Sequence, residues 1–220
     1  MFTKDANGRN LRFENLETRR LMAGDVDVSL HNNGNLDIEG DHHHDGNQIE
    51  MYVVRFGNQA NDRPFYSIRG LDGTTINGRQ EVLVPVDNVT GDINVEMGHY
   101  DDSIDIYAFW TDNDLNIETG RGDDDVHIKD VIVGYQLNID TGADDDFVWV
   151  SDAEIGHESR GDRYPNLVVN TGHGRVDNLW MRDISVLGDT YLTSGTGINV
   201  YFVQNADLAG DLNIRGRSGN

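Results

Sequence analysis

Apolar and polar residues alternate in short runs along most of this chain, and the runs recur at a nearly fixed interval. Five glycines mark the interval, and successive members are 22, 22, 30 and 23 residues apart. They are Gly98, Gly120, Gly142, Gly172 and Gly195. The long interval holds an insertion near 157–165, and the last one holds one extra residue near Arg175–Val176. A fixed period of this kind is typical of a repeat architecture.

Each copy of the repeat contains three short alternating segments, such as Leu115–Ile117, Asp124–Ile128 and Val131–Val133. Alternation predicts β-strands with one set of side chains directed inward, and Val, Ile and Phe dominate that set. The sequence therefore predicts an all-β fold, a single-stranded right-handed parallel β-helix. It would be a three-sided solenoid with about 22 residues per coil. The alternative is a sandwich of antiparallel hairpins, which would not require the same apolar position to recur at each interval.

The regularity of the pattern divides the chain into three parts. Residues 1–24 form an N-terminal segment of different character, 25–90 are expected to form irregular first coils, and 91–220 form regular coils interrupted by the insertion near 157–165. The insertion and the loop 55–64 are expected to protrude from the stack. Protruding loops are where solenoids usually carry binding residues.

Charge and composition narrow the possible functions. The chain has 17 Lys+Arg against 39 Asp+Glu, a formal net charge of -22. Such a surface repels nucleic acid and anionic membranes, so we expect no nucleic-acid partner. The absence of cysteine excludes disulfides, thiolate zinc sites and cysteine nucleophiles. No apolar run is long enough for a transmembrane helix.

Residues 11–25 read LRFENLETRRLMAGD. This segment resembles the N-terminal segment of many exported planctomycete proteins, which typically reads LxxExLExRxLLA. Seven residues match in register: Leu11, Glu14, Leu16, Glu17, Arg19, Leu21 and Ala23. Met22 stands where leucine is usual. The resemblance implies export, and thus a secreted or cell-surface protein, but it implies no enzymatic activity.

Acidic clusters follow three of the glycines and predict columns of stacked aspartates. Carboxylates on neighbouring coils, roughly 4.8 Å apart, repel each other by about 1 kcal/mol in water. A cation would relieve this repulsion, and oxygen-only clusters on turns suit Ca²⁺. Two interpretations stay open: the aspartates only cap turns and keep the surface soluble, or they bind calcium as a cofactor. The predicted calcium ligands are Asp101, Asp102, Asp123, Asp124, Asp145 and Asp146. A second acidic column is formed by Asp130, Asp152, Asp183 and Asn205.

The stretch Thr119–His127 (TGRGDDDVH) resembles the calcium nonapeptide GGxGxDxUx of RTX-type repeats. Thr119 replaces the first glycine, and Val133 stands where a second copy would need aspartate. These departures mean that the calcium sites of that family cannot be transferred whole.

Other residues suggest metal or carbohydrate chemistry. Asp41–Asp45 (DHHHD) is expected to be a polar surface loop, with a transition-metal site as the alternative. Trp149 and Trp180 fall at equivalent positions of neighbouring coils. With Tyr107 or Trp110 they would form an aromatic platform for sugar rings, and the alternative is that they pack on the outer face under the insertion loop. Lys129 and Arg182 share another column, beside the second acidic column.

Two functions remain open. The first is an extracellular or cell-envelope structural or interaction protein, adhesin-like, whose acidic columns bind Ca²⁺ and whose partner is a cell-surface protein, a polysaccharide or another copy docked end to end. The second is a carbohydrate-active β-helix protein that binds or cleaves polysaccharide. No catalytic motif is present, so a binding role is favoured over an enzyme. Carboxylates and a basic residue converging in one groove would favour carbohydrate activity, whereas regular columns alone would favour the interaction protein.

Overall fold

The computed structural model describes residues 24–41, 46–56, 63–156 and 167–216. Within these ranges the regular structure is β-strand, apart from one short 3-10 helix, η1 (Val86–Asn88). The protein is therefore all-β, as its alternating pattern predicts. The N-terminal segment up to residue 23, the histidines at 42–44 and the insertion near 157–165 lie outside the described residues.

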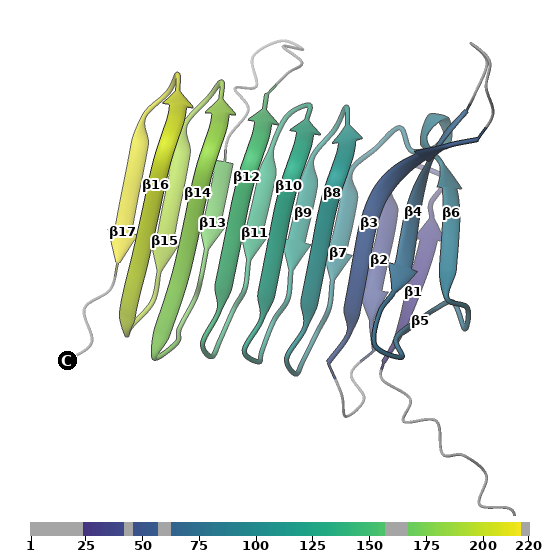
Figure 1. Ribbon diagram of the computed structural model, residues 1–220, viewed down its shortest axis with the longest axis horizontal. Helices are drawn as coiled ribbons and strands as arrows, with labels where there is room; N and C mark the ends of the chain where they lie inside the picture. Colours follow the sequence, from purple (N-terminus) through teal and green to yellow (C-terminus); the bar gives the residue numbers. More distant parts are fainter. Residues whose placement is uncertain (1–23, 42–45, 57–62, 157–166, 217–220) are drawn as a thin grey trace, which may run out of the picture.

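The strands form two sheets (Figure 1). In spatial order the nine-stranded sheet consists of β17 (Leu212–Gly216), β15 (Thr190–Ser194), β13 (Leu167–Asn170), β11 (Leu137–Asp140), β9 (Leu115–Glu118), β7 (Ile93–Glu96), β2 (Leu36–Gly40), β1 (Asp25–Leu30) and β5 (Thr75–Ile76). The eight-stranded sheet consists of β16 (Ile198–Leu208), β14 (Val176–Val186), β12 (Phe147–Ile155), β10 (Asp125–Val133), β8 (Ser103–Thr111), β3 (Gln48–Arg55), β4 (Pro64–Gly70) and β6 (Glu81–Pro85).

From β7 onward the chain alternates between the two sheets, and every neighbouring pair of these strands is parallel. Val126 pairs with Ile104 on one side and with Val148 on the other, so equivalent residues of successive repeats lie side by side. Leu137 pairs with Leu167 across the longer interval, which means that the insertion does not disturb the register. The predicted stacking of equivalent positions is confirmed in this part of the chain.

The second and third predicted segments of each repeat are one strand with a bend. In β10, Val126 and Ile128 are buried, Lys129 and Asp130 both face solvent, and Val131 is buried again. Asp130 has a φ of 56°, in the left-handed region. This single residue shifts the alternation by one position, so that both halves of the strand direct apolar side chains to the same interior. Ala108, Asp152, Asp183 and Asn205 occupy the equivalent bends of the other long strands, also with positive φ.

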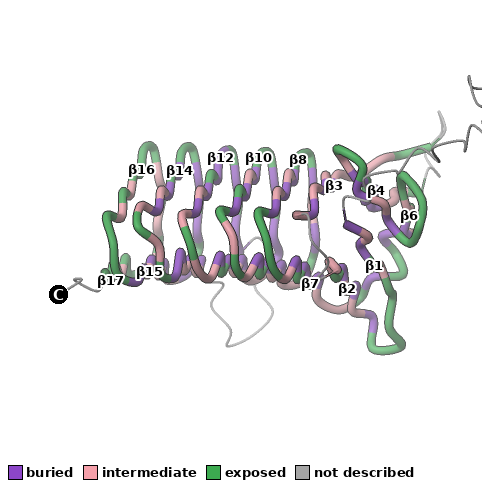
Figure 2. The backbone as a smooth tube through the Cα atoms, turned by 90° about the horizontal axis from the view of Figure 1, so that it is seen from below, coloured by how far each residue is buried: buried purple, intermediate pink, exposed green. Residues whose placement is uncertain are grey.

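The core lies between the sheets and runs the length of the stack (Figure 2). It is built from columns of equivalent aliphatic side chains, and each coil covers the apolar surface of its neighbour. In one column Ile104, Val126, Val148 and Leu179 are each at most 1% exposed. Complete burial of such a side chain stabilises a fold by about 1.5–3 kcal/mol, so the recurring inward positions hold the coils together.

The glycines that mark the period are required by close contact between coils. Gly120 has a φ of 101°, and a Cβ atom placed there would lie 2.0 Å from the carbonyl oxygen of Gly98. Gly142 stands in the same relation to Gly120, also at 2.0 Å. Both the backbone conformation and the contact exclude a side chain, which explains why glycine begins each turn.

The region of residues 25–90 differs from the looser parallel coils expected there. β1 pairs with β2 antiparallel, and β3, β4 and β6 form an antiparallel meander. Only β2 and β3 continue the stack, because they pair in parallel with β7 and β8. Tyr66 of β4 stacks on Phe109 with ring centroids 5.0 Å apart, so the meander covers one end of the core. Alternation predicts which side of a strand is buried, but it does not determine the direction in which the strand pairs.

At the other end, β16 and β17 are the last strands of their sheets among the described residues. Ile198, Leu212 and Ile214 are 66%, 45% and 51% exposed, because none of the described strands packs over β16 and β17 on this side. A free edge of this kind favours strand pairing with another chain. End-to-end association of two copies stays a prediction.

Candidate functional site

The six aspartates predicted to bind calcium separate into an inner and an outer column. Asp102, Asp124 and Asp146 are each at most 2% exposed, and Asp177 continues their column at 1%. Asp101 and Asp123 are exposed and Asp145 is half-buried. Each buried aspartate lies two residues before an inward aliphatic residue, as Asp124 does before Val126. The alternation of inward and outward side chains along the strand therefore indicates that these carboxyls point inward.

Backbone amides link the carboxyls of the inner column. The amide of Asp102 donates to Oδ1 of Asp124 at 2.8 Å, and the amide of Asp124 donates to Oδ1 of Asp146 at 3.1 Å. Thr141 donates its hydroxyl to Oδ2 of Asp146 at 2.6 Å. Within the described part of the chain, Oδ2 of Asp102 and of Asp124 has no hydrogen-bond partner. In Asp102 and Asp124, one carboxyl oxygen is therefore buried between neighbouring coils without a hydrogen-bond partner among the described residues.

Burial raises the pKa values of this column. Desolvation is the main cause, and it raises the pKa of Asp102 to about 7, of Asp124 to about 6 and of Asp146 to about 8. The neighbouring carboxylates of the column raise these values further, whereas hydrogen bonds from amides and threonines lower them. Asp146 is therefore mostly protonated near neutral pH, and a protonated carboxyl is a poor ligand for Ca²⁺.

The outer column is also linked through backbone amides. The amide of Asp123 donates to Asp101 and that of Asp145 donates to Asp123, both at 2.9 Å. Arg175 ends the column with a guanidinium–carboxylate contact of 3.0 Å to Asp145. The amide of Val176, together with the amide and guanidinium of Arg175, lowers the pKa of Asp145. Among the described residues no group of three or more acidic or histidine side chains is arranged to hold a metal ion. Calcium binding stays a prediction.

The second acidic column has a conformational origin. Asp130, Asp152, Asp183 and Asn205 are the residues with positive φ at the bends of their strands. After glycine, Asn and Asp are the residues that most readily adopt this conformation. The column thus recurs with the period of the bends and needs no ligand to account for it.

A groove lies on the outer face of the eight-stranded sheet, over β8, β10, β12 and β14. Its volume is about 500 Å³. The lining side chains include Asp105, Tyr107, His127, Lys129, Trp149, Ser151, Asp152 and Arg182. Ser151 pairs with Lys129 on one side and with Arg182 on the other. Because the side chain of Ser151 is small, it forms the floor of the groove between the longer side chains of Lys129 and Arg182.

Aromatic side chains follow one column of this face. Asp105, His127, Trp149, Trp180 and Phe202 are successive partners across β8, β10, β12, β14 and β16. Trp149, Trp180 and Phe202 are 43%, 44% and 43% exposed. The rings of Trp180 and Phe202 lie 5.1 Å apart, and the ring of His127 meets that of Trp149 edge to face at 6.0 Å. We call Trp149, Trp180 and Phe202 the aromatic column.

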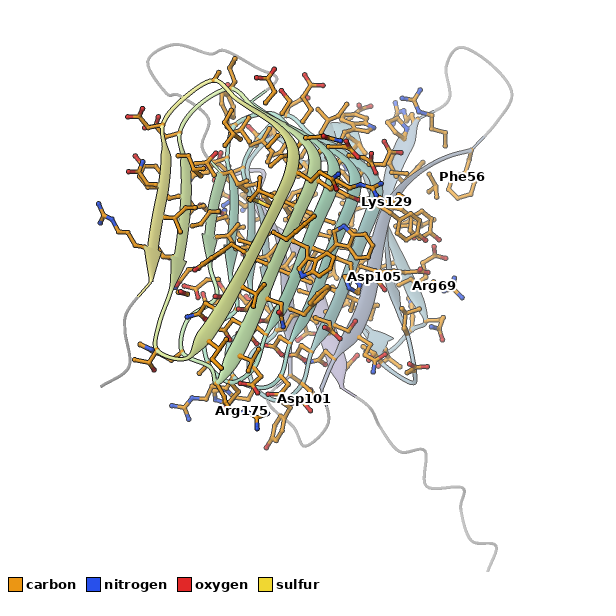
Figure 3. The ribbon with its side chains drawn as sticks, turned by 60° about the vertical axis from the view of Figure 1, so that its left-hand side comes forward. Phe56, Arg69, Asp101, Asp105, Lys129 and Arg175 are labelled. Atoms are coloured by element: carbon orange, nitrogen blue, oxygen red, sulfur yellow. The ribbon has the colours of Figure 1, made fainter. Side chains whose placement is uncertain are left out.

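Ion pairs and hydrogen bonds surround the groove. Nδ1 of His127 lies 3.1 Å from Oδ1 of Asp105, and Nε of Arg182 lies 2.9 Å from Oδ2 of Asp183. Figure 3 shows the side chains of this face, with Asp105, Lys129 and Arg69 labelled. Toward β3, Tyr107 donates its hydroxyl to Glu50 at 3.0 Å. These polar groups are fixed in place around the exposed rings.

The structure brings together most of the residues that the sequence suggested for carbohydrate chemistry. Tyr107, Lys129, Trp149 and Arg182 all line the groove, and Trp180 lies beside it in the aromatic column. Trp110 does not, because it lies beyond the bend of β8, in a separate hollow beside Tyr66 and Val86.

Sequence reasoning missed three contributors to this face. They are Asp105, Ser151 and Tyr52, whose ring stacks on that of Tyr107 at 5.1 Å. The regular period could have found Asp105 and Ser151, which are the equivalents of His127 and Lys129 in neighbouring repeats. No period leads to Tyr52, because β3 precedes the regular coils.

The fold and the groove define an all-β protein of stacked parallel strands with an aromatic outer face. The comparisons bear on its location. A family model described as "Planctomycete extracellular" matches residues 7–26. Neither the curated proteins nor the solved structures gave a match. The matched segment supports an extracellular location, as the resemblance of the N-terminal segment predicts. It says nothing of the repeats, so their resemblance to RTX-type repeats stays a prediction.

The described ranges also bear on membrane insertion. No helix within them has the length and apolar character needed to cross a bilayer.

Proposed function

We propose that this chain is a secreted or cell-surface parallel β-helix protein that binds polysaccharide on the outer face of its eight-stranded sheet. The alternation of the chain between two parallel sheets and the bend in each long strand support a three-sided, right-handed coil of about 22 residues. The extracellular match supports the location, since polysaccharides are major components of cell surfaces and their surroundings.

The observation that carries the proposal is the groove. It combines exposed aromatic rings with Lys129, Arg182, Asp105 and Asp152, the convergence that favours carbohydrate activity over a rod with regular columns alone. Aromatic faces attract the weakly positive C–H groups of a pyranose ring, and fixed polar side chains hydrogen-bond to its hydroxyls. One groove therefore offers both kinds of contact to a sugar.

We propose binding rather than cleavage. Hydrolysis of a glycosidic bond by the usual route needs two carboxyl groups that flank the same bond. Asp105 is engaged by His127, and the position of Asp152 follows from its place at a strand bend. Binding without cleavage fits an adhesin-like role, in which the stacked coils hold the groove at the cell surface.

A panel of soluble polysaccharides in affinity electrophoresis tests the proposal. We expect retardation by at least one polysaccharide and loss of that retardation in Trp149→Ala. Ile132→Ala is the matched control, because Ile132 is 41% exposed but lies on β10 beyond the bend. Equal retardation of Trp149→Ala and the unsubstituted protein would show that binding does not involve the groove.

Calcium binding is a second proposal, supported by the outer column of Asp101, Asp123 and Asp145. Asp101 and Asp123 are exposed, and each uses Oδ1 to accept a backbone amide, which leaves Oδ2 for a cation. Asp145 is half-buried and paired with Arg175. Binding to the folded state at 100 times Kd would add about 2.7 kcal/mol to the free energy of unfolding. Thermal melting with and without millimolar calcium measures this, with Asp123→Asn as the comparison. An unchanged Tm would contradict the proposal.

A further inference from the structure

The direction of the aromatic column limits how a polymer can lie on this face. Trp149, Trp180 and Phe202 are partners on neighbouring strands, so the column crosses the strands and follows the stacking axis. Neighbouring strands are about 4.8 Å apart. A ligand that contacts all three rings must therefore extend along the stack, with its repeating unit close to the spacing of the coils.

The shape of the column also limits the linkage of the polymer. The three residues stand at paired positions of neighbouring strands on one face of a continuous sheet, so they follow a line along the stack. The rings of Trp180 and Phe202 lie 5.1 Å apart, with their planes inclined by 37°. A polysaccharide with equatorial β-1,4 linkages is a flat ribbon whose residues advance by about the coil spacing. An α-1,4-linked glucan winds into a helix and would leave the platform after one or two residues.

The charges around the groove favour a neutral polymer. Most charged groups here are already paired: His127 with Asp105, Arg182 with Asp183, and Arg69 with Glu50. The chain as a whole carries a formal charge of -22, which repels a polyanion. Paired side chains retain donors and acceptors for hydroxyl groups without requiring a charged ligand.

From these observations, and resting on the polysaccharide binding proposed above, we infer that the ligand is a neutral β-1,4-linked glycan lying along the stack from β8 to β16. Trp149, Trp180 and Phe202 contact its successive sugar residues. Lys129, Ser151 and Arg182, in the adjacent column, hydrogen-bond to the hydroxyls on one edge of the ribbon. Four coil spacings of about 4.8 Å separate β8 from β16, so about five sugar residues fill the surface.

Isothermal titration with cello-oligosaccharides of two to six residues tests both the length and the orientation. We expect the affinity to rise steeply with oligosaccharide length up to about five residues, the number that the spacing of the coils sets, and then to level off. Trp180→Ala and Phe202→Ala should each weaken binding of the pentamer about tenfold, which corresponds to about 1.4 kcal/mol. Ile132→Ala should leave it unchanged, and the thermal melting of each variant checks that the fold is retained.

Malto-oligosaccharides and oligogalacturonates of equal length test the linkage and the charge. We expect at least tenfold weaker binding of both. Tighter binding of the oligogalacturonate, abolished by Lys129→Met, would overturn the neutral ligand while leaving polysaccharide binding intact. Equal affinity for cello- and malto-oligosaccharides, or no dependence on length, would overturn the axial ribbon. No binding of any glycan in the titrations and in the polysaccharide panel would instead overturn the proposed function itself.

Discussion

The buried aspartate column makes a specific prediction about how stability depends on pH. Asp146 has an ordinary pKa of 3.8, and burial raises it to about 8 in the folded protein. Between these values the folded state holds a proton that the unfolded state has released. Stability is therefore fully present below the unfolded pKa and is lost as the pH rises through the folded pKa.

The magnitude follows from the proton count. One proton retained only by the folded state lowers the free energy of unfolding by about 1.4 kcal/mol for each unit of rising pH. From pH 5 to pH 8 this amounts to about 4 kcal/mol for Asp146 alone. Asp102 and Asp124, with pKa values raised to about 7 and about 6, act in the same direction. Asp145, whose pKa is lowered, contributes stability that is fully present above pH 3.8, so it does not change the slope in this window.

Asp146→Asn isolates the effect. An amide oxygen can still accept the amide of Asp124, and no charge has to be buried at high pH. The protein itself supports this substitution, because Asn199 pairs with Asp177 in the same column one coil further on. We expect the variant to be more stable than the unsubstituted protein at pH 8. Its slope between pH 5 and pH 8 should be shallower by about 1.4 kcal/mol per unit.

Urea unfolding followed by circular dichroism at pH 5, 6, 7 and 8 provides the free energies. Asp123→Asn in the outer column is the control, since it removes a carboxylate of the same repeat at an exposed position. Its slope should equal that of the unsubstituted protein. The reasoning would be refuted if stability rose between pH 5 and pH 8, or if Asp146→Asn were less stable at pH 8.

Two further predictions concern the backbone. Ala108 holds the bend of β8 with a φ of 46°, where the other bends have Asp or Asn, so Ala108→Gly should raise the free energy of unfolding by about 0.5–1 kcal/mol in urea titrations. A decrease would show that the bend does not strain this residue. Gly120→Ala should lower the free energy of unfolding by more than about 2 kcal/mol, because the Cβ of the new alanine would meet the carbonyl oxygen of Gly98. A fall in Tm of only a degree or two would contradict that contact.

The repeat could be predicted from the sequence because residues at equivalent positions of successive repeats also pack side by side in the folded protein. Val126 and Val148 are each followed by another apolar residue two positions on, and stacking them one coil apart buries both columns together. Lys129, Trp149 and Arg182 follow from the same register. The groove was not predictable in the same way, because it depends on Ser151 being short enough to leave a hollow between its neighbours.

The sequence by itself determined the all-β class, the inward positions, the glycines at the turns and the alignment of equivalent residues. These are consequences of local alternation and of the period, which any folded form of the chain must satisfy. Only the tertiary structure decided the antiparallel end formed by β3, β4 and β6, the bend at residues such as Asp130, and how completely the inner aspartates are buried. Each depends on which surfaces finally pack together, since the cost of burying a carboxyl or reversing a strand is set by its neighbours in space.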